Sequence, residues 1–589
     1  MVALDRQKRM DICGQQDSED VGEANRLNRL RVLYSPPFLL NIALALQHVL
    51  VQASLCALVV GALVEEAERE RMAGSVFFYS GICTLLQSYF GTRLPLVQAP
   101  SLDFLVPALV LLSAQTGTPA VCRGQCEKSN EIEGPTHPVR EFQGMAVVAG
   151  LVQLLVGWSG VGGALLGCCG PLVLTPVLCM LGFSVYREAA LLCSDHWGLA
   201  LLTVVLLVFL SQHLRFCFLP ACLKFPQCPI FSMLSVLLSV LLVWAVFLAL
   251  FYYGHISPHS VPELLLENTR FNASQTEKRS ILNSSRLLFT DSTTPWLILP
   301  VPGDLGLPLL SGRSIAAGVA AGLSSSISSQ AVYVLAARLL KAPTPPAQAC
   351  NRGLSVEGLG SVLAGLMGAP VGLCSSVANA CTLGLSQCGS RGSVQLAGVM
   401  LLVLGVFLRL TQLLTSIPLA IHGAVLSVTY TVAAGTGITY LQYTDVDSGR
   451  NLFNTGFTVF MSLVLLHWFR IRPGFINTGV PGLDVFLQSC LMLPVLVVGV
   501  LAFFLEHTVS GTLSERGLEQ DQSTKMIYSL ADQLEGASQS QEAVYSPPEV
   551  VRRVMGLSAL RIVPFCACRS SDVQKTRVTS PETSTLLPQ

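Results

Sequence analysis

Charged residues are scarce in this sequence, since only 12% of its 589 residues are Asp, Glu, Lys or Arg. Soluble domains carry roughly a quarter, so the shortage argues against a soluble globular protein. The sequence holds 36 acidic and 36 basic residues, which leaves no net charge to attract nucleic acid. Hydrophobic residues make up 51% of the chain, a composition typical of a protein that lies in the lipid bilayer.

Motifs of common enzymes are also missing. The sequence has no P-loop, no His or Cys set at metal-ligand spacing, and no nucleophile elbow outside its apolar stretches. We therefore expect no enzyme activity, no cofactor and no bound metal site. Residues 1–37 are polar and hold no apolar signal-peptide core, so we expect the first membrane helix to direct insertion.

Apolar runs of membrane-spanning length recur along the whole chain. Crossing a bilayer takes about twenty apolar residues as a helix. Apolar runs between polar breaks predict an all-α polytopic protein of about fourteen segments, seven on each side of a long loop. The predicted segments are 38–64, 73–91, 95–114, 143–166, 168–184, 197–213, 229–253, 314–337, 353–370, 373–389, 393–412, 418–440, 452–469 and 484–505.

The long loop from residue 254 to residue 313 carries two glycosylation sequons, at Asn272 and Asn283. A cytoplasmic amino terminus followed by seven crossings places this loop outside the cell and the carboxyl terminus inside. Basic residues of the short loops mostly agree with this topology. Those on the expected cytoplasmic side are Arg93, Arg215, Lys224, Arg338, Lys341, Arg352, Arg391 and Arg450, whereas Arg187, Arg470 and Arg472 are exceptions.

Most of the 19 cysteines lie in apolar segments, where cysteine usually acts as a small buried hydrophobe. Cys122 and Cys126 lie in a polar loop and could form a disulfide if that loop faces outside, with free thiols as the alternative. From Glu506 onward the sequence is rich in Ser, Gln and Glu, which predicts a mostly disordered cytoplasmic tail over 506–589.

The third predicted segment is interrupted by proline. Pro95, Pro100 and Pro107 exclude one regular helix between residues 93 and 112, because proline lacks the N–H donor and clashes with the preceding turn. Ser101 directly follows Pro100 and is a typical helix-capping residue. We therefore predict a short extended strand followed by a half-helix that begins inside the membrane.

The tenth predicted segment, residues 368–391, is interrupted in a different way. Gly372, Ser375, Ser376 and Asn379 stand where a lipid-facing helix would carry leucines, so this backbone should be buried against protein. Interrupted segments at matching places in two halves indicate inverted repeats, with helix N-termini directed at a substrate near the midplane. Two ordinary kinked helices are the alternative.

Three polar residues inside apolar segments need partners. Asp103 lies among apolar neighbours, so an ion, a proton or a hydrogen-bond donor should accompany it, although a structural carboxylate is an alternative. His48, next to Gln47 in the first segment, is either a ligand or a satisfied core histidine. Glu357 is interpreted as a structural brace between helices.

These residues lie in blocks that resemble the nucleobase-ascorbate transporters, also called nucleobase-cation symporters, and within them the vitamin C transporter branch. The similarity covers most of the chain from Gln47 to Gly517. The matching blocks are Gln47-His48, RLPLVQAPSLDFLVPA from Arg93, LSSSISSQAVY from Leu323, NRGLSVEG from Asn351, DSGRNLF from Asp447 and GTLSERG from Gly511.

The resemblance implies two inverted repeats of seven segments, divided into a core domain and a gate domain that move against each other. It also implies a homodimer that contacts through the gate. The expected divisions are an N-terminal tail 1–37, core 38–166, gate 167–253, outer loop 254–313, core 314–417, gate 418–505 and tail 506–589. The substrate-binding residues implied are His48, Ser101, Leu102, Asp103, Ser328, Ser376, Ala378 and Asn379.

The chain departs from the family pattern at its expected site. Ser328 replaces the family's substrate-binding Glu, and Val332 replaces an acidic residue common in the vitamin C branch. In the tenth segment only Asn379 of the family signature is kept. These replacements resemble the divergent third, orphan member of that branch.

The expected function is secondary active transport of a purine nucleobase such as hypoxanthine across the plasma membrane, coupled to sodium, with Asp103 taking part of the cation role. The alternatives are sodium-dependent L-ascorbate transport, a carrier fold that serves as an interaction protein without transporting, and an ion channel or exchanger. The expected partners are a small-molecule substrate, the lipid bilayer and a second copy of the chain, with no nucleic acid.

Overall fold

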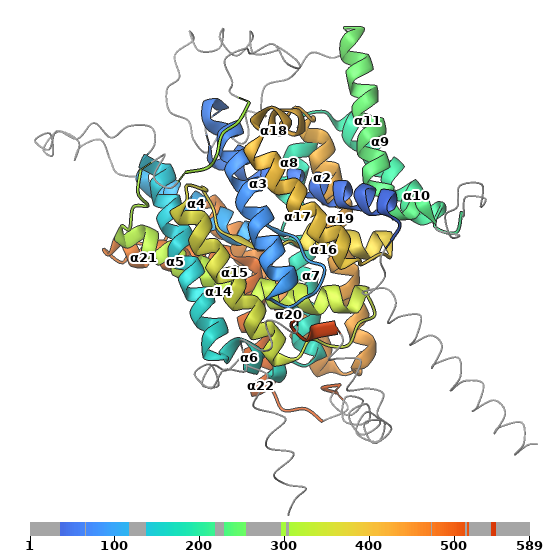
Figure 1. The fold of residues 1–589 in the computed structure, drawn as a ribbon. Helices are drawn as coiled ribbons and strands as arrows, with labels where there is room; N and C mark the ends of the chain where they lie inside the picture. Colours follow the sequence, from blue (N-terminus) through green and yellow to red (C-terminus); the bar gives the residue numbers. More distant parts are fainter. Residues whose placement is uncertain are drawn as a thin grey trace, which may run out of the picture.

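The computed structural model describes residues 36–64, 66–116, 137–217, 229–254, 296–301, 306–472, 474–512, 515–517 and 544–548. This part of the chain is almost entirely helical, and its one sheet consists of two three-residue strands. Seven of the described helices are long and apolar enough to cross a membrane, or eight if one bent pair counts as a single span. The chain is therefore a multi-pass helical membrane protein (Figure 1).

The first half of the chain contains the first strand and the helices that pack around it. In order these elements are α2 (Phe38–Leu63), α3 (Glu66–Tyr89), β1 (Gln98–Pro100), α4 (Leu102–Thr116), α5 (His137–Ser159), α6 (Val161–Cys168), α7 (Pro171–Phe183), α8 (Tyr186–Cys193), α9 (Trp197–Val208), the π-helical turn η2 (Phe209–His213), α10 (Ile230–Met233) and α11 (Ser235–Tyr252).

The second half repeats this pattern of long helices around one short strand. Its elements are α14 (Gly312–Leu339), α15 (Ala347–Leu366), β2 (Leu373–Ser375), α16 (Val377–Ser386), α17 (Arg391–Val406), α18 (Leu408–Thr415), α19 (Leu419–Thr439), the 3₁₀ turn η4 (Tyr440–Tyr443), α20 (Gly449–Ile471), α21 (Pro481–Met492) and α22 (Pro494–Thr508).

Four predicted segments are each divided into two helices in the structure, and one of them, 229–253, breaks at Leu234 between α10 and α11. Segment 143–166 breaks at Gly160, whose φ of 79° ends α5 and starts α6. Segment 393–412 breaks at Phe407, which has an extended backbone between α17 and α18. Segment 484–505 is wrong as one straight span, because α21 and α22 meet at an angle of 76° where Pro494 cannot continue the helix.

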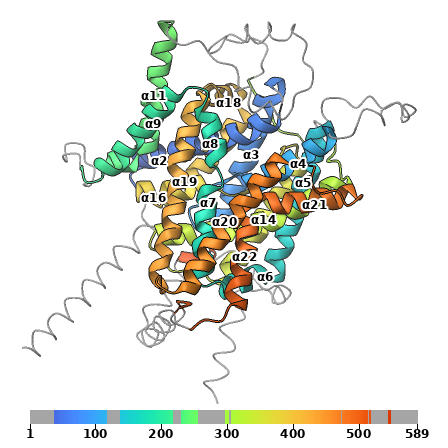
Figure 2. The same ribbon diagram turned by 180° about the vertical axis from the view of Figure 1, so that it is seen from behind.

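Helix contacts divide the helices into two packed groups, and Figures 1 and 2 show the whole bundle from opposite sides. In one group α5 packs against α14 and α15, while α17 packs against α2 and α3. In the other group α19 packs against α7, α8 and α9, and α22 packs against α7 and α20. Contacts of α14 with α21 and of α2 with α19 join the two groups.

Small residues allow the closest helix contact of the first group. Gly150 of α5 faces Gly358 of α15, and a Cβ added to Gly358 would lie 2.4 Å from the Leu154 nitrogen and 2.6 Å from the Gly150 oxygen. The two backbones therefore touch without intervening side chains. Such small-residue contacts are a common means of packing helices inside a membrane.

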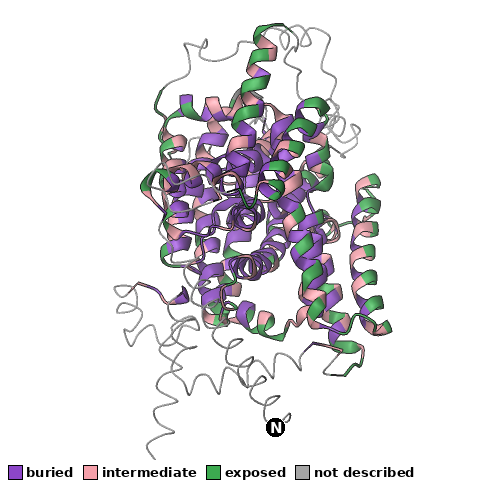
Figure 3. Cartoon of the chain, turned by 90° about the vertical axis from the view of Figure 1, so that its right-hand side faces the viewer, coloured by how far each residue is buried: buried purple, intermediate pink, exposed green. Residues whose placement is uncertain are grey.

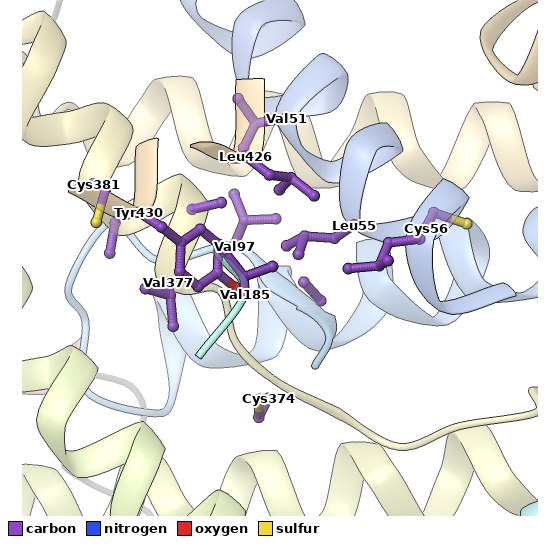
Figure 4. Packing of buried hydrophobic residues seen from close by; sticks show 14 of the residues in the cluster. Val51, Leu55, Cys56, Val97, Val185, Cys374, Val377, Cys381, Leu426 and Tyr430 are labelled. Atoms are coloured by element: carbon purple, nitrogen blue, oxygen red, sulfur yellow. The ribbon is translucent and has the colours of Figure 1, made fainter. Parts of the chain in front are cut away.

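Buried residues concentrate on the inner helices, whereas the outer helices keep exposed faces (Figure 3). Helix α20 is an outer helix, and only 28% of its most apolar 18-residue stretch is buried. Phe453, Phe460 and Trp468 project outward from it. On the inside, apolar side chains of α2, α16 and α19 meet near the two strands, among them Val51, Val377 and Leu426 (Figure 4).

The predicted tail boundary at residue 506 lies inside a helix. Glu506 belongs to the last turns of α22 and forms an ion pair of 2.8 Å with Arg450 of α20. Farther along, Val544 and Tyr545 are buried against the helices. Glu506, Val544 and Tyr545 are therefore exceptions to the mostly disordered tail that the sequence predicts.

Candidate functional site

The two interrupted segments meet as an antiparallel pair of strands. Gln98 of β1 lies opposite Ser375 of β2, and Pro100 lies opposite Leu373. A serine follows each strand and caps the next helix: the Ser101 hydroxyl accepts the Asp103 N–H at 3.1 Å, and the Ser376 hydroxyl accepts the Asn379 N–H at 3.2 Å. Because the strands are antiparallel, α4 and α16 leave from opposite ends of the pair.

Asp103 is surrounded by hydroxyl groups. Its Oδ1 accepts hydrogen bonds from Ser324 at 2.5 Å and Ser328 at 3.1 Å, both on α14, and its Oδ2 accepts from Ser101 at 3.2 Å. The side chain is buried, and none of the ion pairs in the described part of the chain involves it. The carboxylate also lies in the first turn of α4, where the helix dipole favours negative charge.

His48 joins the first long helix to the second interrupted segment. Its Nδ1 lies 2.9 Å from the Asn379 Oδ1, so the imidazole donates at Nδ1 and leaves Nε2 as an acceptor. Four residues further along α2, Gln52 donates to the Gln98 carbonyl of β1 at 3.2 Å. The same face of α2 therefore contacts both interrupted segments.

Glu357 lies at the centre of a polar cage that holds the two halves together. Its carboxylate accepts hydrogen bonds from six neutral side chains, and it is 1% exposed. The donors are Gln87 at 3.1 Å, Gln98 at 3.3 Å, Gln153 at 3.0 Å, Ser329 at 2.5 Å, Tyr333 at 2.7 Å, and Ser375. These residues come from α3, β1, α5, α14 and β2, so Glu357 braces elements of both halves.

The two carboxylates use different pairs of positions on α14. Ser324 and Ser328 donate to Asp103, whereas Ser329 and Tyr333 donate to Glu357. Each pair is four residues apart, and residues at that spacing lie on the same face of a helix. Sequence reasoning missed Ser324, although its spacing from Ser328 is the signal that could have identified it.

Gln47, the neighbour of His48, contacts a helix break rather than the interrupted segments. Its amide nitrogen donates to the Met233 carbonyl at 3.1 Å, and its amide oxygen accepts the Leu237 N–H at 3.3 Å. These two groups flank the junction of α10 and α11, where regular helical bonding is interrupted. Gln47 therefore joins α2 to that junction.

The structure brings together several of the predicted site residues but not all. Ser101, Asp103 and Ser328 share one cluster, and His48, Ser376 and Asn379 share another. Leu102 and Ala378 offer no polar side chain, and Ala378 is fully buried. Val332, also fully buried, supplies no polar group. The predictions for Asn272, Asn283, Cys122 and Cys126 fall outside the described residues.

The Permease family matches residues 41–471 of the chain. Solute carrier family 23 member 3 of Mus musculus is 42% identical over 507 residues, which cover 82% of this chain and 78% of that protein. Solute carrier family 23 member 1 of Mus musculus is 33% identical over 82% of this chain and 81% of its own length. Nucleobase-ascorbate transporter 1 of Arabidopsis thaliana is 28% identical over 82% of this chain and 90% of its own length.

Similarity to solved structures is weaker. The transmembrane domain of a cyanobacterium bicarbonate transporter, BicA, aligns with a TM-score of 0.42 at 14% identity, covering 79% of this chain and 96% of that one. The sequence identity is higher with member 3 than with member 1, which confirms the expected likeness to the divergent third member. The chain belongs to the nucleobase-ascorbate transporter family, within the group formed by solute carrier family 23.

Proposed function

We propose that the protein is a secondary active transporter of a purine nucleobase such as hypoxanthine, coupled to sodium. The observation that carries this proposal is Asp103, a buried carboxylate at the start of α4 whose only described partners are hydroxyl groups. A carboxylate accepts hydrogen bonds from ring N–H groups of a purine, and bonds to charged acceptors are stronger than those to neutral ones.

The start of α16 supplies complementary donors for the same ligand. The Ser376 hydroxyl accepts the Asn379 N–H, and the N–H groups of Val377 and Ala378 have no protein acceptor in the described part of the chain. First-turn N–H groups bind carbonyl or anionic oxygens. A purine carbonyl oxygen fits these donors, and the Asn379 amide adds both a donor and an acceptor.

The same hydroxyl cluster is suited to sodium. Carboxylate and hydroxyl oxygens are ligands for hard cations, and Ser101, Ser324 and Ser328 lie within hydrogen-bond distance of Asp103. Hydroxyl groups can rotate to present lone pairs to an ion that binds at the carboxylate. Glu357 is less suited, because six donors already occupy its oxygens.

An architecture of about fourteen segments in two inverted repeats is part of the proposal, and helix packing supports it. If α2, α3, α4 and α5 correspond to α14, α15, α16 and α17, the main contacts among these helices have counterparts. The contact between α5 and α15 corresponds to the contact between α17 and α3. The contact between α14 and α5 corresponds to that between α2 and α17, and the contact between α14 and α4 corresponds to that between α2 and α16. Exchanging the two halves exchanges β1 with β2, so the pairing of these strands stays the same.

We further propose that residues 38–166 and 314–417 form a core domain, and that residues 167–253 and 418–505 form a gate domain. Both termini would be cytoplasmic in a plasma-membrane homodimer. Arg93, Arg352 and Arg391, all expected on the cytoplasmic side, gather around one segment of the chain in the structure, which agrees with a shared side.

L-ascorbate is the second candidate substrate, because the Arabidopsis relative is named a nucleobase-ascorbate transporter and the free N–H groups of α16 could bind its anion. A third possibility, a carrier fold without transport, follows from the replacement of carboxylates at Ser328 and Val332.

Uptake of labelled hypoxanthine and labelled ascorbate tests the proposal in cells that express the chain, with sodium present or replaced by choline. We expect saturable, sodium-dependent uptake of hypoxanthine above vector controls. Sodium-dependent uptake of ascorbate alone would establish the second substrate. If neither substrate is taken up although the protein is verified at the cell surface, the result would favour a carrier fold that does not transport.

A further inference from the structure

A short segment of the carboxyl-terminal region, residues 544–548, is bound to the helical body. Val544 is 5% exposed and Tyr545 is 3% exposed. The Tyr545 hydroxyl donates to the Pro343 carbonyl at 2.6 Å, in the connection between α14 and α15. Burial raises the pKa of the Tyr545 hydroxyl above its ordinary value, so this group remains a protonated donor at neutral pH.

Three arginines bind the main chain of this segment at successive residues. Arg391 donates to the Val544 carbonyl, Arg352 donates to the Tyr545 carbonyl at 2.7 Å, and Arg93 donates to the Ser546 carbonyl. The arginines come from separate places in the chain: the connection before β1, α15 and the start of α17. Their convergence on adjacent carbonyls makes a site for an extended peptide.

The arginines are also tied to one another through the connection that leads into β1. The Arg391 Nε donates to the Arg93 carbonyl at 2.8 Å, and the Arg352 Nε donates to the Gly91 carbonyl at 2.8 Å. Arg93 has a φ of 62°, a left-handed conformation that non-glycine residues rarely adopt. The Arg352 and Arg391 contacts hold this connection in place, so the three arginines are positioned by the helical body as well as by the segment.

We propose that Arg93, Arg352 and Arg391 form a peptide-docking site whose ligand is segment 544–548 of the same chain, and that negative charge at Ser546 strengthens the docking. The guanidinium groups of the site bind main-chain carbonyls of the segment. The Pro343 carbonyl accepts a hydrogen bond from the Tyr545 side chain. Docking braces the connection that enters β1 and thereby attaches the carboxyl-terminal region to the interrupted segments.

The charge dependence follows from what surrounds Ser546. Arg93 and Arg391 have no acidic side-chain partner in the part of the chain that the structure describes, and both bind this segment. Ser546 is only partly buried, so a charged replacement there can be accommodated. A carboxylate at Ser546 would attract the guanidinium groups, whereas an ammonium would be repelled.

Photo-cross-linking in the full-length protein in membranes tests the proposal. Tyr545 is replaced by p-azidophenylalanine, which places the azide where the hydroxyl meets Pro343. Trypsin cleavage after Lys341 and Arg352 then releases the peptide that contains Pro343, and mass spectrometry measures its cross-linked fraction. The same residue at Tyr528, which lies outside the described residues, is the position control.

We expect a cross-link to the Pro343 peptide from position 545, with a yield about threefold higher for Ser546→Glu than for Ser546→Lys. High salt should narrow this difference because it screens exposed charges. Arg391→Gln should lower the yield, and Arg187→Gln, which removes an exposed positive charge elsewhere, should leave it unchanged.

Two results would overturn the proposal. Absence of the Pro343 cross-link, while the azide reacts with other peptides, would show that the segment does not dock at this site. Equal yields for Ser546→Glu and Ser546→Lys would disprove the role of charge. Both Ser546 variants leave the helical body unaltered, so a folding defect cannot imitate either result.

Discussion

Two buried carboxylates of this protein are surrounded by very different numbers of donors. Asp103 accepts from three hydroxyl groups, two of them on one oxygen, whereas Glu357 accepts from six side chains. An ionised carboxylate offers about four lone-pair sites. Asp103 therefore retains capacity for a ligand or ion, and Glu357 does not.

Asp103→Asn should raise the sodium concentration needed for half-maximal uptake by at least about tenfold, since bonds to a charged group are worth about 1.5–3 kcal/mol. The amide keeps the size of the side chain but removes its charge. Sodium titration of uptake, normalised to surface protein, measures the effect. Asp447→Asn, at an exposed carboxylate, is the control, and an unaltered sodium dependence in Asp103→Asn would rule out the ion role.

Glu357→Gln should destabilise the protein by about 2–3 kcal/mol, because the new amide N–H₂ meets groups that are themselves donors. The expected result is a lower melting temperature of the detergent-solubilised protein and less protein at the surface. Thermal unfolding monitored by size-exclusion chromatography gives the measurement. A melting temperature equal to that of the unmodified chain would show that the cage is not a structural brace.

Individual site residues could be predicted only in part. Asp103 and Asn379 stood out as polar residues in apolar segments, and His48 stood out beside Gln47. The partners could not be inferred, because Gln87, Gln98 and Gln153 come from three elements whose contacts depend on tertiary packing. Nothing in the local sequence around Arg93 or Arg391 indicates that they bind segment 544–548.

At the scale of elements, the closest packed contact is the one between α5 and α15. A Cβ at Gly358 would lie 2.4 Å from the Leu154 nitrogen, so Gly358→Val must push the helices apart. We expect a loss of about 1–3 kcal/mol from overpacking, measured as a lower melting temperature. Gly61→Val is the matched control, because a Cβ at Gly61 meets nothing within 4 Å; equal effects of both variants would contradict the contact.

Helix breaks were predictable where the local chemistry causes them. Pro100 and Ser101 locate the junction of β1 and α4, and Ser376 locates the start of α16. Phe407 carries no such signal, yet its backbone is extended between α17 and α18. Its neighbour explains why: Ile298 donates to the Val406 carbonyl at 3.0 Å, a tertiary contact that local sequence does not reveal.

For the molecule as a whole, α2 carries polar links to the group of helices that we assign to the gate. Gln47 binds Met233 and Leu237 at the α10–α11 junction, and the Ser54 hydroxyl lies 2.9 Å from the His422 Nδ1 of α19. Between these links the contact is apolar, with Val51 and Leu55 beside Leu426 (Figure 4). If core moves against gate during transport, these links must break and re-form.

Gln47→Leu should therefore shift the balance between conformations of the transporter. Two hydrogen bonds of about 1 kcal/mol each are lost in the conformation described here, which favours a conformation without them by roughly tenfold or more. Fluorophores introduced as unnatural amino acids at Leu155 of α5 and Phe460 of α20, both exposed, report the distance between the two groups. We expect a larger fraction of the variant than of the unmodified chain to show a second distance between the two fluorophores.

The matched control for that experiment is Ser239→Ala, because the Ser239 hydroxyl donates only to the Ser235 carbonyl within α11. Ser54→Ala tests the second link and should shift the distances in the same direction as Gln47→Leu. If the distance distribution of Gln47→Leu equals that of Ser239→Ala, the links at α2 do not govern motion between the groups. The movement would then be controlled elsewhere, with the contact of α14 and α21 as the next candidate.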